Sequence, residues 1–592
     1  MFASWNAAAT MRAPSPLTVV ALGGLGEIGM NCLALEQGGL GDAPPERLVV
    51  DCGVTFPTSD DGVDLFHPRF DALFEGPHQL VGVVVTHGHE DHIGGLPYLL
   101  AHARAQRNTA GASHAPLVVW APPYSLALCR ERCAEHGFGA DAVELRAIAP
   151  GERYEAGAFV FEPVRVAHST VDAVGLVIET AAGTVVHTGD FKLEACPLDG
   201  EATDEARLRA AGDAGVALLL SDSTNVFSAG EAGGERDVAD TLERIVARAP
   251  GRVVVGLFAS NVHRLGALGD VAAKTGRKLC LLGRSLRRHA DVARAVGRLG
   301  WPSDLVVAPE IAAKLPRAQL LYLATGTQAE ARGALARLAA AQHPELRVGP
   351  GDLVVLSSRV IPGSERAVHA MCDDFLRLGA ELRTRFTDPG IHVSGHAHRD
   401  EQRRMLELVR PRAFVPLHGT LHHLVEHAKL ARETGAESLV VVDGERVELG
   451  PTAANGEPRL RKLGPVCAGK VAVSSTGQRV DEATLRARRG LARTGAVFVA
   501  LGIEPGLASG PPNIDVQISA HGVCDPEGVM RAAAGAARAA VVAARSGAVE
   551  DLVEAVRRAV WQRLGSAGQE RPSVSVLVTS PDRALDSARR TP

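Results

Sequence analysis

The segment THGHEDH, residues 86–92, constrains this chain more than any other feature. It places four residues that can bind first-row metal ions within six positions, directly after the apolar run VGVVV, which predicts a strand. One loop at a strand end can direct His87 and His89 at one cation, and Asp91 and His92 at a neighbouring cation. A lone histidine is more often a structural residue, but this spacing favours a metal site.

Three further candidate ligands follow other predicted strands. His168 ends the run FEPVRVAH, Asp190 ends VVHTGD, and His418 lies in VPLHGT. Open α/β sheets bind ligands at the carboxyl ends of their strands, so these side chains are expected to meet the residues of the first motif. Asp51, at the end of the run VVD, is expected to lie behind a ligand histidine and to orient it.

The seven ligands divide into two overlapping sets that share a bridging carboxylate and leave room for a shared water. We expect one cation at His87, His89, His168 and Asp190, and a second at Asp91, His92, Asp190 and His418. Imidazole and carboxylate ligands suit zinc and manganese alike, and we expect two divalent ions, with zinc as the first choice and manganese as the alternative. Such a pair activates water for phosphodiester hydrolysis, which makes Asp91 and Asp190 catalytic candidates.

Bulk properties exclude some classes of protein. A chain of 592 residues is too long for one core, so two to four domains are expected. The net charge of −5 argues against nucleic-acid binding over the whole surface but allows a local basic groove. Nine scattered cysteines without a CxxC pair indicate a reduced, cytoplasmic protein. No apolar run is long enough to cross a membrane, and residues 1–16 read as a disordered tail rather than a signal peptide.

The remaining pattern predicts an α/β fold with several domains. Residues 226–390 alternate strand and helix in four units, which predicts a parallel sheet flanked by helices. Residues 451–470 carry Gly and Pro with little periodicity and are expected to be a linker. Residues 471–592 predict a small α/β domain with one Ala/Arg-rich helical stretch at about 526–565.

Several motifs occur in the order found in the ribonuclease J family, which belongs to the β-CASP group of the metallo-β-lactamase superfamily. They are LTVVALGGLGEIGMN, DCGVTFP, THGHEDHIGG, HTGDFK, LLSDSTN, FASNVHR, GRS, GTQAE, IPGSE, HVSGHA and VPLHGT. The long stretch between Asp190 and His418 resembles the β-CASP insertion, because compact hydrolases of this fold need only a few dozen residues there. The resemblance implies a metallo-β-lactamase αββα core over 17–225 and 391–450, interrupted by a β-CASP domain over 226–390.

The resemblance also implies an activity and partners. It implies 5′-to-3′ exonuclease and endonuclease action on RNA, in rRNA processing and mRNA decay. It further implies a cytoplasmic location and a homodimer or homotetramer formed through the C-terminal domain. Glu235 matches the acidic residue of the first β-CASP motif, and His396 matches a histidine that contacts the scissile phosphate; both are implied to be catalytic.

A nucleotide-binding surface is expected at further strand ends. Stretches that match the family supply Ala259, Ser260, Asn261, His392, Val393, Ser394, Gly395 and His396. Ser357 and Ser358 lie at another strand end and are expected to join them. Gly395 would let the backbone approach a phosphate.

Three positions depart from the family pattern, and two alternatives stay open. Ala329 stands in GTQAE where the family has glycine, His398 follows SGHA, and Thr420 replaces a carboxylate in HGT. One alternative is a DNA-directed or structure-specific β-CASP nuclease, which sequence separates poorly because few contacts read the 2′-hydroxyl. The other is a non-catalytic RNA-binding scaffold, against which the complete ligand set argues.

Overall fold

The computed structural model describes residues 15–39, 41, 43–57, 62–110, 115–361, 363–450, 460–504, 513–544, 549–566 and 571–579. Most of the expected N-terminal tail and the first half of the expected linker therefore lie outside the described residues. The described residues form two compact units. The first unit holds those up to 471, apart from 62–64, and the second holds 62–64 together with those from 472 onwards.

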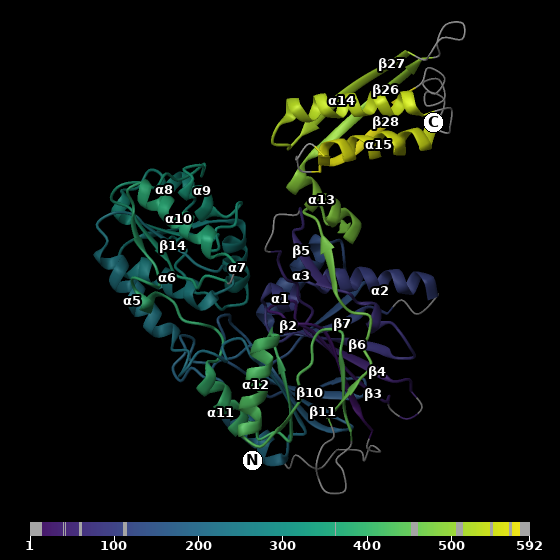
Figure 1. The fold of residues 1–592 in the computed structure, drawn as a ribbon. Helices are drawn as coiled ribbons and strands as arrows, with labels where there is room; N and C mark the ends of the chain where they lie inside the picture. Colours follow the sequence, from purple (N-terminus) through teal and green to yellow (C-terminus); the bar gives the residue numbers. More distant parts are fainter. Residues whose placement is uncertain are drawn as a thin grey trace. The chain divides into compact units, whose positions relative to one another are not determined.

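Two facing sheets form the core of the first unit (Figure 1). One sheet has the order β23 (Leu460–Leu463), β22 (Arg446–Leu449), β1 (Leu17–Gly23), β3 (Cys32–Gln37), β4 (Glu46–Val50), β6 (Gln79–Val84), β7 (Leu117–Ala121), β8 (Val143–Ala147). The other has the order β21 (Glu437–Ser438), β19 (Ala413–Leu417), β13 (Leu218–Asp222), β12 (Gly183–His187), β11 (Val174–Thr180), β10 (Phe159–Arg165), β9 (Tyr154–Ala156). Apolar side chains from both sheets, such as Leu48 and Phe161, pack in one buried cluster between them.

Helices cover the outer face of each sheet. Because strand residues alternate between faces, Val49 points away from Leu48 and packs with α2 (Leu96–Ala110) and α3 (Pro123–Glu135). On the second sheet, Leu219 packs with α4 (Glu205–Ala214), α11 (Arg399–Val409) and α12 (Leu421–Glu433). The four layers confirm the predicted αββα fold class.

The inserted domain is built on a five-stranded parallel sheet. Its order is β15 (Lys278–Leu282), β16 (Leu320–Ala324), β14 (Val253–Gly256), β17 (Leu353–Leu356), β18 (Glu381–Arg383). Three helices, α5 (Glu235–Arg248), α6 (Val262–Lys274) and α7 (Arg284–Ala295), pack with one face. Two others, α9 (Ala334–Ala339) and α10 (Glu365–Arg377), pack with the other face.

Three details differ from the sequence-based expectation. The edge strand β18 was missed, because the short segment ELR carries two charged side chains and no apolar run. Within the expected linker, residues 460–463 form β23 and pair with β22, so these four residues belong to the large sheet. The helical stretch expected at about 526–565 is divided into two helices, α14 (Pro526–Ala543) and α15 (Val549–Ser566).

The second unit is a small α/β domain. Its three-stranded sheet has the order β27 (Asn513–His521), β26 (Ala496–Glu504), β28 (Ser573–Thr579). One face of this sheet packs on α14 and α15 through an apolar cluster that includes Val499, Ala533 and Val560. Among the described residues of the whole chain, no helix is long and apolar enough to cross a membrane.

Candidate metal centre

The seven predicted metal ligands converge at the carboxyl ends of strands in the two large sheets. His87 and His89 lie in the loop after β6, and α1 (Glu90–Ile93) carries Asp91 and His92. The other three follow strands of the second sheet: His168 comes after β10, Asp190 after β12 and His418 after β19. Residues far apart in the sequence therefore share one edge of the sandwich.

The first group of ligand atoms surrounds one point. His87 Nε2 and His168 Nε2 lie 3.0 and 3.2 Å from His89 Nδ1. The same two nitrogen atoms lie 3.8 and 3.9 Å from Asp190 Oδ2. Burial lowers the pKa of His89 to about 4, and it also lowers the pKa values of His87 and His168 well below their ordinary range. These imidazoles are therefore neutral at physiological pH, which is the state that binds a cation.

The second group shares Asp190 with the first. His92 Nε2 lies 3.2 Å from Asp190 Oδ2, and His418 Nδ1 lies 2.8 Å from Asp190 Oδ1. His418 Nε2 lies 3.5 Å from Asp91 Oδ2. His418 has a φ of 49°, in the left-handed region that is unfavourable for a residue with a Cβ. Such backbone strain is typical of positions fixed by function.

Both groups fit divalent metal ions. Ligands bound tetrahedrally at 2.0–2.1 Å lie about 3.3 Å from one another, within the range of spacings seen here. His418 Nε2 is buried and has no hydrogen-bond partner among the described residues, although a buried polar atom without one is costly. Burial alone would lower the pKa of His418, but the Asp190 carboxylate beside it raises that pKa to about 10. A cation in this group would take the place of that proton.

Other side chains orient the ligand histidines. Asp51 lies behind His92, whose Nδ1 donates to Asp51 Oδ2 at 2.8 Å, while Asp51 Oδ1 accepts from the Thr86 backbone N–H at 2.7 Å. His168 Nδ1 donates to the Gly395 carbonyl at 2.7 Å. A Cβ on Gly395 would lie 2.6 Å from Ser169 Oγ. Glycine is therefore needed there for close packing against the ligand loop, a reason that differs from the predicted approach to a phosphate.

Asp222, the last residue of β13, was missed by the sequence reasoning and lies beside the metal ligands. Its Oδ2 accepts a hydrogen bond from His396 Nδ1 at 2.8 Å, and its Oδ1 lies 3.8 Å from His418 Nδ1. Asp190, Asp222, His396 and His418 form a third group of converging ligand atoms. The strand-end rule that selected Asp51 and Asp190 would also have selected Asp222, which ends the run LLLSD.

His396 lies at the edge of this centre. Its side chain is 22% exposed, so a substrate can reach it, whereas Asp222 and Asp190 are buried. Burial alone would lower the pKa of His396, but these two carboxylates outweigh that effect and raise it. Asn225 fixes the loop that carries His396, because its amide donates to Ser394 Oγ at 2.8 Å and to the His396 carbonyl at 3.0 Å.

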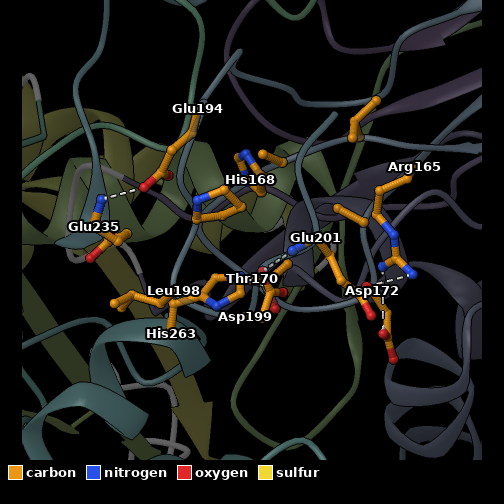
Figure 2. Close-up of a pocket in the computed structure, with 14 residues that line it drawn as sticks. Arg165, His168, Thr170, Asp172, Glu194, Leu198, Asp199, Glu201, Glu235 and His263 are labelled. Atoms are coloured by element: carbon orange, nitrogen blue, oxygen red, sulfur yellow. Dashed lines mark hydrogen bonds and ion pairs between the residues drawn. The ribbon is translucent and has the colours of Figure 1, made fainter. Parts of the chain in front are cut away.

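Glu235 belongs to a separate buried network. Arg264 donates to both of its carboxylate oxygens, with Nη2–Oε1 at 2.6 Å and Nε–Oε2 at 3.2 Å. Asn261 Nδ2 also donates to Oε1 at 3.1 Å. Figure 2 shows Glu235 lining the same pocket as His168, with the Glu194 carboxylate accepting from the Glu235 backbone N–H. None of the three groups of converging ligand atoms found among the described residues includes Glu235.

Most of the other predicted substrate-binding residues already have protein partners. Asn261 caps α6 by accepting from the Arg264 backbone N–H at 2.9 Å. Ser357 is buried, and its hydroxyl donates to the Ile391 carbonyl at 2.6 Å. Arg264 contacts His392 Nδ1 at 2.8 Å and donates to the Val393 carbonyl at 3.4 Å. Ala259 and Ser260 are half-buried beyond the end of β14, and Ser358 is buried beyond the end of β17.

The three departures from the family pattern lie outside the ligand groups. Ala329 has a φ of 60°, the left-handed conformation that favours glycine. His398 forms a capping box with Glu401 at the start of α11. Thr420 Oγ1 contacts His423 Nδ1 at 2.6 Å at the start of α12.

Comparisons with known proteins agree with this geometry. Residues 46–219 match a model described as a beta-lactamase superfamily domain, and residues 250–375 match the beta-CASP domain of ribonuclease J. Residues 381–441 match a Zn-dependent metallo-hydrolase RNA specificity domain. Ribonuclease J of Mycolicibacterium smegmatis is 35% identical over 95% of this chain and 97% of its own length.

The chain belongs to the ribonuclease J family. Ribonuclease J of Thermus thermophilus is 37% identical over 81% of each chain, and that of Helicobacter pylori is 33% identical over 83% of this chain and 68% of its own. This ribonuclease J-like chain is therefore a metal-dependent nuclease of the hydrolase class. A buried His/Asp cluster in this chain could hold such metal ions.

Proposed function

We propose that this chain hydrolyses RNA phosphodiester bonds at two divalent metal ions, with zinc as the first choice and manganese as the alternative. The observation that carries the proposal is the pair of ligand groups that share Asp190. One group would use His87, His89, His168 and Asp190, and the other would use Asp91, His92, Asp190 and His418. A non-catalytic RNA-binding scaffold would have no need of seven converging ligands with Asp51 behind them.

The chemistry follows from the positions of the side chains. When bound, two such cations polarise the phosphoryl group and make a water molecule nucleophilic at neutral pH. Asp190 Oδ2 lies beside His87 and His168 of the first group, and its Oδ1 lies beside His418 of the second, so this carboxylate could serve both ions. Asp91 would complete the second group. The water oxygen would bond to phosphorus while the bond from phosphorus to the 3′-oxygen breaks. The products would carry a 5′-phosphate and a 3′-hydroxyl.

His396 is the proposed donor to the leaving 3′-oxygen. Its Nδ1 is held by Asp222, which leaves Nε2 for the substrate. The Asp222 carboxylate raises the pKa of His396, which favours a ring that can neutralise charge on the scissile phosphate or give its proton to the leaving group. Groups in this role typically contribute about 10²–10⁴ in rate.

Glu235 is proposed to act indirectly rather than as a catalytic residue. Both of its carboxylate oxygens are occupied by Arg264 and Asn261. Arg264 in turn donates to the carbonyls of Ser357 and Val393, at the base of the loop that carries His396. Glu235 would therefore position that loop, which explains why an acidic residue can matter without touching the substrate.

The proposed reaction is 5′-to-3′ exonuclease and endonuclease cleavage of RNA in processing and decay; its RNA substrate is supported by the similarity to relatives named ribonuclease J. The test is a time course with one unstructured RNA carrying either a 5′-monophosphate or a 5′-triphosphate, run beside the same sequence as DNA. Metal content is measured on the same sample. We expect mononucleotides with 5′-phosphates, released faster from the monophosphorylated RNA. Internal fragments alone would remove the exonuclease proposal, and equal cleavage of DNA would favour the DNA-directed alternative.

We also propose assembly through the C-terminal domain, as a homodimer or homotetramer, and action in the cytoplasm. The sheet face opposite α14 and α15 exposes Phe498 and Leu577, which are 50% and 63% accessible. Exposed apolar side chains on one sheet face favour burial against a partner. All nine cysteines are free, which is typical of a reducing compartment.

A further inference from the structure

The carboxyl edge of the β-CASP sheet carries residues that the catalytic proposal does not use. All five strands are parallel, so their carboxyl ends share one edge, where α/β sheets bind ligands. Arg359 lies just beyond β17, and Arg385 and Phe386 lie just beyond its neighbour β18. All three side chains are exposed.

The two arginines follow neighbouring strands of the sheet, β17 and β18. Partial desolvation and the positive charge of Arg385 lower the pKa of Arg359. Burial lowers the pKa of His392, and the positive charges of both arginines lower it as well. Among the ion pairs of the described residues, neither arginine has a carboxylate partner. Two like charges held together without a counter-charge favour an anion between them.

Phe386 provides an apolar surface next to these charges. Phe386 is 70% exposed, more than any other exposed Phe or Trp side chain among the described residues. Its ring stacks on His369, with centroids 6.3 Å apart and planes inclined by 20°, and the Arg385 guanidinium lies 5.6 Å from its centroid. Leu356 and Val368 line a pocket beside it. A flat ring flanked by a cation is the platform on which nucleobases stack.

One residue links this edge to the metal centre. Asn225 Oδ1 accepts from Arg359 Nη1 at 2.8 Å, while Asn225 Nδ2 donates to Ser394 Oγ and to the carbonyl of His396. Arg359 is thus tied to the loop that presents His396. The pocket of Figure 2 is lined by carboxylates such as Asp199 and Glu201, so it is unsuited to a phosphate.

We infer that Arg359, Arg385 and Phe386 form a subsite for one nucleotide of single-stranded RNA, leading to the metal centre. The inference rests on the proposed RNA substrate. The arginines bind the phosphate through planar guanidinium donors, and the base stacks on Phe386. An RNA strand fits both features at once, whereas a simple anion would use the arginines alone.

The experiment compares steady-state kinetics of the metal-loaded full chain on an unstructured 5′-monophosphorylated RNA over a series of salt concentrations. The variants are Arg385→Gln, Phe386→Leu and Phe386→Tyr. The controls are Arg377→Gln and Leu376→Ala, which change exposed residues on α10. Metal content and thermal unfolding are measured for each protein.

We expect Phe386→Leu to raise KM about 5- to 150-fold, the range for loss of one stacked base, with the change in KM rather than in kcat. Phe386→Tyr keeps a ring face and should retain most of the affinity. Arg385→Gln should raise KM and reduce the slope of log KM against log salt by about 1, as expected for one lost phosphate contact. The two control variants should match the wild type.

Unchanged KM and salt slope in Arg385→Gln and Phe386→Leu, beside an active wild type, would overturn the subsite while leaving the proposed function intact. A wild type with full metal content that does not cut RNA would overturn the proposed function, and the subsite with it. Arg359→Lys tests the third member without removing its charge. We expect a raised KM, because a lysine cannot reproduce the forked contact, and wild-type kinetics would exclude Arg359 from the subsite.

Discussion

Replacing Asp222 by asparagine would keep the size of the side chain but remove the charge that holds His396. The wild-type Asp222 Oδ1 accepts from the Thr224 backbone N–H at 2.9 Å and from the Thr224 hydroxyl at 2.6 Å. These donors would hold the asparagine oxygen in the same place. The amide NH₂ would then occupy the position of Oδ2, 2.8 Å from His396 Nδ1.

An amide donor in that position faces the N–H of a protonated His396. The ring must lose the Nδ1 proton or turn away, so it can no longer present a positively charged Nε2–H to the substrate. Hydrogen bonds to charged groups contribute about 1.5–3 kcal/mol. At 1.36 kcal/mol for each factor of ten, kcat/KM should fall by about 10- to 160-fold. The metal content should not change, because Asp222 lies outside the two main ligand groups.

The assay is initial-rate kinetics on the monophosphorylated RNA, with elemental analysis of the same protein. Asp213→Asn is a matched control, because Asp213 is exposed and pairs with the surface residue Arg410. Wild-type kinetics in Asp222→Asn would refute the role given to this carboxylate. Loss of a metal ion would instead make Asp222 a ligand, as the third group of converging atoms allows.

Other substitutions test the rest of the site. Asp190→Ala should lose both metal ions and His418→Ala only one, by elemental analysis; full metal content in Asp190→Ala would contradict the bridging role. Asp51→Asn should weaken metal affinity about 10- to 100-fold in a metal titration, because His92 loses the carboxylate that accepts from its Nδ1 and orients its ring; unchanged affinity would leave Asp51 a structural residue. Arg264→Met should lower the free energy of unfolding, measured by urea denaturation, by about 3–5 kcal/mol, because the buried Glu235 carboxylate loses its arginine partner. A change below about 1 kcal/mol would show that water reaches this carboxylate. Truncation after residue 471 should shift the protein towards monomer in light scattering, with the large sheet intact; an unchanged oligomer would place the interface elsewhere.

The sequence by itself predicted the chemistry of the metal centre. The ligands His87, His89, Asp91 and His92 lie within one short loop, so their proximity is a local property that spacing reveals. The later ligands could be predicted because each follows an apolar run, and strand ends in such sheets meet at a common edge. The parallel sheet of the β-CASP domain also follows from periodicity, which depends on neighbouring residues only, whereas the αββα core was expected from the resemblance to the family.

Only the tertiary structure decided what the neighbouring residues do. The proposed positioning role of Glu235 depends on Arg264, on another helix, which donates to both of its carboxylate oxygens. The partnership of Asp222 with His396 joins residues 174 positions apart, and no local pattern records it. The same holds for Arg359 and Phe386, which follow the paired strands β17 and β18, because β18 is too short and too polar to predict. Spacing therefore identifies groups that act from one loop, whereas charge partners and substrate contacts depend on packing between distant segments.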